Sequence, residues 1–284
     1  FLEISCIIYV NVYQPDRPIS RKTSLRRHYY ILNSYFMRRG KMKKLTSLLL
    51  VFAMALACAG CGSSGKGGDT DAKSEGVMTY EEYMAADLES EVVVEAYVQA
   101  KQSWWENQAT VYAQDKDGGY FFYNMTCSEE DYAKLTPGTK IKVTGYKAEW
   151  SGEVEIIDAT FEIGEGSFVA EAEDVTSLLG SDDLIKHQNK FVSFKGLTVE
   201  AADESGAAFL YNWDGSGQEG DDLYFNVSVD GQTYTFTVES YLCDSTTDVY
   251  AAVKGFNVGD TIDAEGFLYW YEGVNPHITS VTVK

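Results

Sequence analysis

The chain has 284 residues and 43 acidic side chains against 23 basic ones, which gives a net charge of −20. From Cys61 onward the imbalance is steeper, because 41 acidic side chains face 13 basic ones, all of them Lys. Affinity for phosphate backbones comes from cationic groups, and Arg is the usual bidentate phosphate ligand. The composition therefore disfavours nucleic acid as a partner, and it excludes nucleases that use Arg to stabilise a phosphoryl transition state.

The N-terminal segments have the organisation of an exported protein. Residues 1–41 are basic and lack periodicity, and we interpret them as a leader outside the native protein that starts at Met42. Residues 42–60 contain two Lys, an apolar run and small residues before a Cys, the anatomy of a secretory signal too short to span a membrane. The sequence "CAGC" resembles a bacterial lipoprotein signal, which implies lipidation of Cys61 and a location on the outer face of the cell membrane. Lipidation at Cys58, or an ordinary cleaved signal, is the alternative.

A tether and a short helix come next. Residues 61–77 are rich in Gly and Ser, a composition typical of flexible linkers. Thr79 and Glu82 have the spacing of a capping box, which predicts a helix at the start of the folded part.

The rest of the chain contains an internal repeat. Residues 90–163 can be aligned with residues 189–283. They predict a first barrel over residues 78–163 and a second over residues 182–284, joined by a linker with a short predicted helix at residues 164–181. Each copy begins with a run of alternating apolar residues, which predicts a strand. These runs are Val92–Ala100 and Phe191–Val199.

Each copy continues with a hairpin, a helix and two strands. The hairpins have Asp-Gly at their tips, at Asp117 and Asp230. The helices are predicted to begin at Ser128 and Ser245, each followed three residues later by an Asp. The fourth strands carry a Gly at the same point, Gly145 and Gly266.

This order of elements resembles the OB-fold superfamily and, more loosely, uncharacterised exported lipoproteins that carry such barrels. The segment "PGTKIKVTGYK" is its most specific part, because a Gly there permits the bend that closes the sheet. The resemblance implies a mainly β fold with two tandem five-stranded OB-like Greek-key barrels, each with a short helix between strands three and four. Two small β-sandwiches would have the same strand count.

The resemblance also indicates where a ligand would bind. OB barrels bind ligands on strands two and three, between the loop joining strands one and two and the loop joining strands four and five. In the first copy these loops hold a Trp pair and a third Trp, which we expect to meet at one rim beside Tyr residues of the hairpin. The predicted ligand-binding residues of both copies are Trp104, Trp105, Trp150, Tyr112, Tyr120, Tyr123, Trp213 and Trp270. The alternative is that the Trp side chains seal the barrel core.

Signals for catalysis and metals are weak. After the signal, from residue 62 onward, the chain lacks the H-E-x-x-H, C-x-x-C, G-x-S-x-G and P-loop motifs, so we expect neither an enzyme nor a cofactor. The loop Asp214–Asp222 is rich in oxygen ligands but lacks the Gly and Glu of an EF-hand, and we expect a solvated loop without metal. Cys127 and Cys243 either pair in an oxidising compartment or, as we expect, are separate buried thiols.

These observations favour a non-catalytic ligand-binding or interaction module of an envelope-anchored lipoprotein. The expected partner is an oligosaccharide or another envelope protein, bound at the aromatic rim. The alternatives are a single-stranded nucleic-acid-binding OB protein and an enzyme with an unrecognised carboxylate site.

Overall fold

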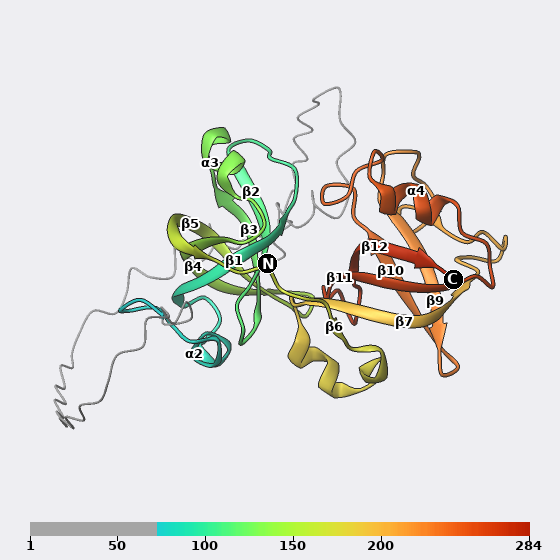
Figure 1. The fold of residues 1–284 in the computed structure, drawn as a ribbon, viewed down its shortest axis with the longest axis horizontal. Coiled ribbons are helices and arrows are strands. Elements are labelled where there is room, and N and C mark those ends of the chain that lie inside the picture. Colours follow the sequence, from blue (N-terminus) through green and yellow to red (C-terminus); the bar gives the residue numbers. More distant parts are fainter. Residues whose placement is uncertain (1–72) are drawn as a thin grey trace, which may run out of the picture. The chain divides into compact units, whose positions relative to one another are not determined.

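The computed structural model describes residues 73–284, which are mainly β and form two closed five-stranded barrels (Figure 1). Both barrels belong to one compact unit of the chain. Barrel closure rules out the β-sandwich alternative. The leader, the signal, Cys61 and most of the tether lie outside the described residues.

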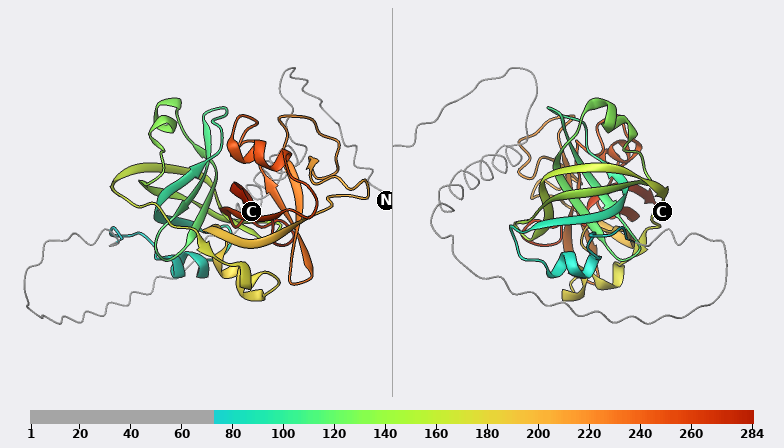
Figure 2. Two further views of the ribbon diagram at one scale, coloured as in Figure 1. Left: turned by 45° about the vertical axis from the view of Figure 1, so that its right-hand side comes forward. Right: turned by 90° about the vertical axis from the view of Figure 1, so that its left-hand side faces the viewer.

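The first barrel has the strand order β1-β2-β3-β5-β4, closed by antiparallel pairing of β1 with β4. Its strands curve around one apolar core (Figure 2), to which β1 contributes Val92 and Val94 and β4 contributes Ile141 and Val143. Its elements are α2 (Tyr80–Ala85), β1 (Glu91–Lys101), β2 (Gln108–Gln114), β3 (Gly119–Thr126), α3 (Glu129–Lys134), β4 (Thr139–Trp150) and β5 (Glu153–Ser167).

The second barrel repeats this plan. Strand β7 pairs with both β9 and β11, β12 pairs with β11, and a single parallel pair between Thr237 and His277 joins β10 to β12. Its elements are β6 (Glu173–Asp174), the 3-10 helices η1 (Thr176–Leu178) and η2 (Asp182–His187), β7 (Phe191–Glu200), β8 (Leu210–Tyr211), β9 (Leu223–Val229), β10 (Gln232–Val238), α4 (Asp248–Lys254), β11 (Thr261–Phe267) and β12 (His277–Val283).

Local sequence signals explain these elements. Asp230 and Gly231 both have positive φ, 51° and 78°, as a two-residue hairpin turn requires. A side chain at Gly145 or Gly266 would collide with the neighbouring strand, because a Cβ would lie 2.7 Å from Ile156 Cγ2 or 2.2 Å from the His277 carbonyl oxygen. Both glycines are therefore required for barrel closure, as the sequence predicts.

Two predicted boundaries are wrong. Helix α4 is capped by Thr247 rather than Ser245, because the Asp244 side chain binds Thr246 and forms a turn that leaves Thr247 at the cap. Strand β5 continues to Ser167, past the expected end of the first barrel at residue 163.

The two described cysteines, Cys127 and Cys243, are buried free thiols, which excludes a disulfide between them in this structure.

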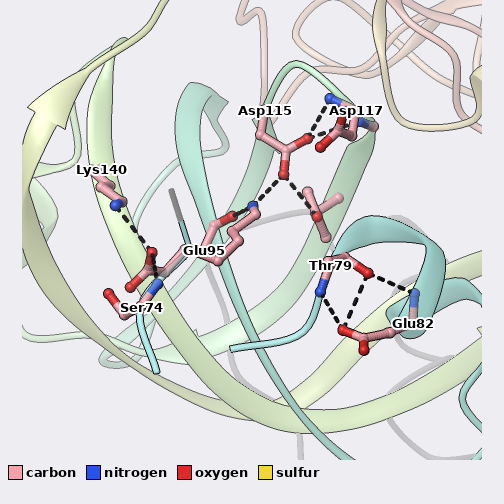
Figure 3. Close-up of polar contacts among 10 residues, drawn as sticks. Ser74, Thr79, Glu82, Glu95, Asp115, Asp117 and Lys140 are labelled. Atoms are coloured by element: carbon pink, nitrogen blue, oxygen red, sulfur yellow. Dashed lines mark hydrogen bonds and ion pairs between the residues drawn. The ribbon is translucent and has the colours of Figure 1, made fainter. Parts of the chain in front are cut away.

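The last part of the predicted tether is fastened to the first barrel (Figure 3), so the prediction of a flexible linker is wrong for Lys73 and Ser74. The Lys73 ammonium forms an ion pair of 2.5 Å with Asp115 and donates a hydrogen bond to the Glu95 carbonyl oxygen. Glu95 accepts a bond from the Ser74 amide and pairs with Lys140 at 3.0 Å. We call these contacts of Lys73 and Ser74 with Asp115 and Glu95 the clasp. Because Asp115 and Glu95 are buried, the clasp fixes the point where the tether meets the barrel.

The predicted capping box of α2 is present, since the Thr79 side chain accepts from the Glu82 amide and the Glu82 carboxylate accepts from the Thr79 amide (Figure 3). Across residues 73–284, no helix combines the length and the apolar character needed to cross a bilayer.

Candidate ligand-binding face

The outer face of β2 and β3, the expected ligand-binding surface of the first barrel, is aromatic. Val111 and Phe122 point into the core, so strand alternation turns Tyr112, Phe121 and Tyr123 outward. Tyr112 and Phe121 are direct cross-strand neighbours, with ring centroids 4.8 Å apart.

The second barrel covers this face. Phe267 stacks on Tyr112 with centroids 4.4 Å apart and an interplanar angle of 12°, and Tyr269 meets the Phe121 ring edge to face at 5.5 Å. The Tyr112 hydroxyl lies 2.9 Å from Nδ1 of His277. Tyr112 is 0 % exposed and Tyr123 is 9 % exposed. The expectation that these two tyrosines line an open rim is therefore wrong, because Tyr112 is buried against the second barrel and Tyr123 is buried as well.

Polar contacts fasten the same interface along its length. The amide of Phe191 donates to the Gln114 side chain at 2.7 Å, and the amide of Trp270 donates to the Glu153 carboxylate at 2.9 Å. Trp270 also packs against Gly152, where a Cβ would lie 2.7 Å from the indole. Trp270, predicted to bind ligand, thus takes part in the contact between the barrels.

Tyr120 points in the opposite direction, into the first barrel. Its hydroxyl donates to Asp115 at 3.0 Å, and its ring packs edge to face on Tyr80 with centroids 5.4 Å apart. Burial, reinforced by the Asp115 carboxylate, raises the pKa of Tyr120 well above its ordinary value. Its place at the rim was wrongly predicted, because it belongs to the core.

The Trp pair and Trp150 do not share one rim. Trp105 precedes Gln108, which pairs with the last residue of β3, whereas the other end of β3 lies beside the start of β5, next to Trp150. The eight residues of β3 separate these ends by about 24 Å. The two Trp side chains of the pair also differ: Trp104 is partly buried and donates to the Cys127 carbonyl oxygen at 3.0 Å, whereas Trp105 is 40 % exposed.

The equivalent face of the second barrel is polar. Leu223, Phe225 and Phe236 point into the core, so the alternate residues of β9 and β10 point outward. These outward residues are Tyr224, Asn226, Ser228, Thr233, Thr235 and Thr237. All six are uncharged hydroxyl or amide side chains, and the hairpin Leu223–Val238 contains no Lys or Arg. We call these six residues the polar face.

Hydrogen bonds hold the polar face in place while its middle stays accessible. The Thr235 hydroxyl donates to the Asn226 side-chain oxygen at 2.8 Å, and Asn275 donates to the Thr237 hydroxyl at 3.1 Å. Thr233 and Thr235 are exposed, Asn226 and Ser228 are partly exposed, and Thr237 is buried. The sequence-based prediction missed these residues, although the alternation in "LYFNVSV" and "TYTFTV" carries their signal.

Carboxylates border the polar face. Glu200 accepts a hydrogen bond from Ser228, and Asp222 accepts from the amide and hydroxyl of Ser240. Burial, followed by the negative charges of Asp222 and Glu239, raises the pKa of Tyr224 well above its ordinary value. Tyr224 therefore stays a neutral hydroxyl, and the electrostatic surroundings repel anionic ligands.

The acidic loop Asp214–Asp222 uses its carboxylates in local turns. Asp214 accepts from the amide and hydroxyl of Ser216, and Asp221 accepts from the amide of Gln218. Within residues 73–284, no group of three or more His, Cys, Asp or Glu side chains has the geometry of a metal site. Trp213, in this same loop, is 60 % exposed. None of the interface contacts described above involves it.

Comparisons with known proteins found only distant structural similarities. No protein-family model matches the chain, and no curated protein matches its sequence. The chain is similar to a murine DNA-binding protein bound to double-stranded DNA, at 12% identity over 67% of this chain and 97% of that one, with a TM-score of 0.33. It is similar to the p204 HINb domain at 12% identity over 70% of this chain and 100% of that one, with a TM-score of 0.31.

A replication protein A heterotrimer bound to single-stranded DNA is similar at 11% identity, over 68% of this chain and 49% of that one, with a TM-score of 0.29. At such low identities and TM-scores, function has to be argued from this chain's own residues. The chain has the fold of a tandem OB-type barrel protein. The face formed by the second and third strands is buried in the first barrel and partly open in the second.

Proposed function

We propose that this chain is an exported, lipid-anchored, non-catalytic binding protein that holds a neutral, hydroxyl-rich ligand, an oligosaccharide, on the polar face of its second barrel. The observation that carries the proposal is the polar face itself, an uncharged surface with an accessible middle at the position where OB barrels bind ligands.

The chemistry of the polar face fits sugar hydroxyls. Ser, Thr and Tyr hydroxyls donate and accept hydrogen bonds, and the Asn side chain offers both a donor and an acceptor group. The bond between Thr235 and Asn226 fixes these groups before a ligand arrives. Such preorganisation lowers the entropic cost of binding.

The N-terminal segments support the anchored location. A signal-like run before Cys61 and a Gly-rich tether of residues 61–77 together suit a protein held near a membrane surface. The clasp formed by Lys73 with Asp115 gives such a tether a defined attachment point on the first barrel.

Single-stranded nucleic acid is the second candidate ligand. The barrel type favours it, because aromatic side chains beside an OB face stack on bases, and Trp105 and Trp213 are exposed. The charge opposes it, because Glu200, Asp222 and Glu239 surround the polar face and its hairpin has no Lys or Arg.

Titration of the full chain distinguishes the two ligands. Calorimetry with a panel of neutral oligosaccharides and with single-stranded DNA, at low and high salt, should give glycan binding that changes little with salt. DNA binding would instead weaken steeply as salt rises. Analysis of the glycans after incubation checks turnover, since an enzyme would release product.

Two substitutions locate the site. Thr235→Val removes an exposed hydroxyl from the polar face and should lower glycan affinity by about tenfold, the loss expected for one hydrogen bond in a formed site. Thr160→Val is the matched control, because Thr160 is an exposed residue of β5 in the first barrel. No glycan binding by the wild type, or equal affinities for both variants, would contradict the proposal.

A further inference from the structure

The loop between β1 and β2 of the first barrel, residues 102–107, reaches the second barrel. The amide of Ser103 donates to the Tyr241 carbonyl oxygen at 2.7 Å. The side chain of Gln102 donates to the Glu239 carboxylate at 2.8 Å. Two successive residues of one barrel are thus bound to the segment that follows β10 in the other.

That segment continues one end of the polar face. Thr237 and Tyr224 are the last cross-strand pair of the polar face at this end, and Glu239 stands two residues beyond Thr237. Glu239 directly follows Val238, the last residue of β10, and Val238 pairs with Leu223, the chain neighbour of Tyr224. The order of residues at this end is therefore Tyr224, Glu239 and then Gln102 of the first barrel.

A tight turn fixes Trp105 beside this end. Trp105 and Gln108 bond each other through both amides, at 3.2 and 2.9 Å. The two residues between them have positive φ, 48° and 60°, as in a two-residue hairpin turn. Trp105 begins the turn and follows Ser103 by two residues in the chain. The hydrogen bond from Ser103 to Tyr241 therefore holds the backbone of Trp105 close to the second barrel.

Trp104 and Trp105 have different roles. Trp104 supports the fold through its bond to the Cys127 carbonyl oxygen, whereas 40 % of Trp105 is exposed. The polar face offers hydroxyls and amides, and Tyr224 at its end is partly buried. Tyr224 is the one aromatic residue of the polar face, and because it is partly buried, Trp105 is the more exposed aromatic surface near this end.

We propose that Trp105 of the first barrel supplies the stacking surface for a sugar ring bound at the Tyr224 end of the polar face. The binding site is then a composite of both barrels, and the buried aromatic interface of the first barrel holds Trp105 in register with it. This inference rests on the proposed glycan function.

The test compares three variants of the full chain by glycan titration, using the oligosaccharide from the panel that binds the wild type most tightly. Trp105→Ala should lower the affinity by about tenfold, in line with the contribution of one stacked ring. Trp105→Tyr keeps an aromatic surface and should restore most of that loss. Tyr146→Ala is the matched control, since Tyr146 is 42 % exposed on β4 of the first barrel, and it should bind as the wild type does.

A second readout follows the Trp fluorescence. Glycan should change the emission of the wild type and of Tyr146→Ala, and this change should be mostly lost in Trp105→Ala. Unfolding midpoints of all the variants check that the barrels stay folded.

The outcomes separate the two proposals. If Trp105→Ala binds glycan as tightly as the wild type while Thr235→Val does not, the composite site is wrong and the polar-face function stands. If the wild type binds no neutral glycan, both proposals fail.

Discussion

The strand-two and strand-three faces of the two barrels occupy the same position in the fold and differ in chemistry. The face of the first barrel presents Tyr112 and Phe121, which are buried under Phe267 and Tyr269 of the second. The polar face of the second barrel stays partly open. The repeat thus uses one copy of a surface to join the barrels and leaves the other copy accessible to a ligand.

The largest expected effect comes from breaking the aromatic interface. Tyr112→Ala removes a fully buried ring that stacks on Phe267, and it should lower the free energy of unfolding by about 3 to 5 kcal/mol. Denaturant unfolding measures the change, and the exposed Thr160→Ala serves as the control. A loss below about 1 kcal/mol would mean that the two faces are equally open in solution.

A smaller effect should follow from crowding the edge of the interface. Gly152→Ala places a Cβ against Trp270 at a residue with φ of 94°, and should cost about 1 to 3 kcal/mol of unfolding free energy. Gly206→Ala is the matched control, because Gly206 has φ of 81° and no atom within 4 Å of the added Cβ. Equal losses in the two variants would show that backbone strain alone is responsible.

The clasp on the first barrel should produce a pH dependence. Burial alone would raise the pKa of Glu95, but hydrogen bonds from Ser74 and Lys140 outweigh it and lower the pKa below its ordinary value of 4.5. Because the folded state favours the carboxylate, its contribution is complete above pH 4.5 and is lost as the pH falls through the lowered pKa. The unfolding free energies of the wild type and Glu95→Gln should therefore converge as the pH falls. Curves of unfolding free energy against pH that stay parallel for the two proteins would contradict this.

The smallest effect concerns the free thiols. Burial raises the pKa of Cys127 to about 11 and that of Cys243 to about 12. Both therefore stay protonated at pH 8 and should react slowly with a thiol reagent in the folded protein. Labelling should become rapid in urea, and fast labelling of the native chain would show that the barrels open.

The sequence was sufficient for the barrel plan because the decisive signals are local. The Asp230-Gly231 turn, the closing glycines Gly145 and Gly266 and the cap at Thr79 each depend on neighbouring atoms or on a strand adjacent in the sheet. The cap of α4 was misplaced because Ser245 and Thr247 both have a capping side chain. Only the turn formed by Asp244 decides between them.

The site was harder to predict because it depends on contacts between the barrels. Nothing near Tyr112 in the sequence indicates that Phe267 will cover it, so an aromatic hairpin is as consistent with a buried interface as with a ligand surface. The polar residues of β9 and β10 were visible as an alternating pattern. Their meaning depends on their accessibility, which follows only from the way the barrels pack.

The most direct test of this difference is a map of backbone amide chemical shifts during titration of the full chain with a neutral oligosaccharide. Shifts should change at Asn226, Ser228 and Thr235 and leave Tyr112 and Phe121 unaffected. Changes centred on Tyr112 and Phe121, with the polar face unaffected, would contradict the assignment of the open face as the binding site.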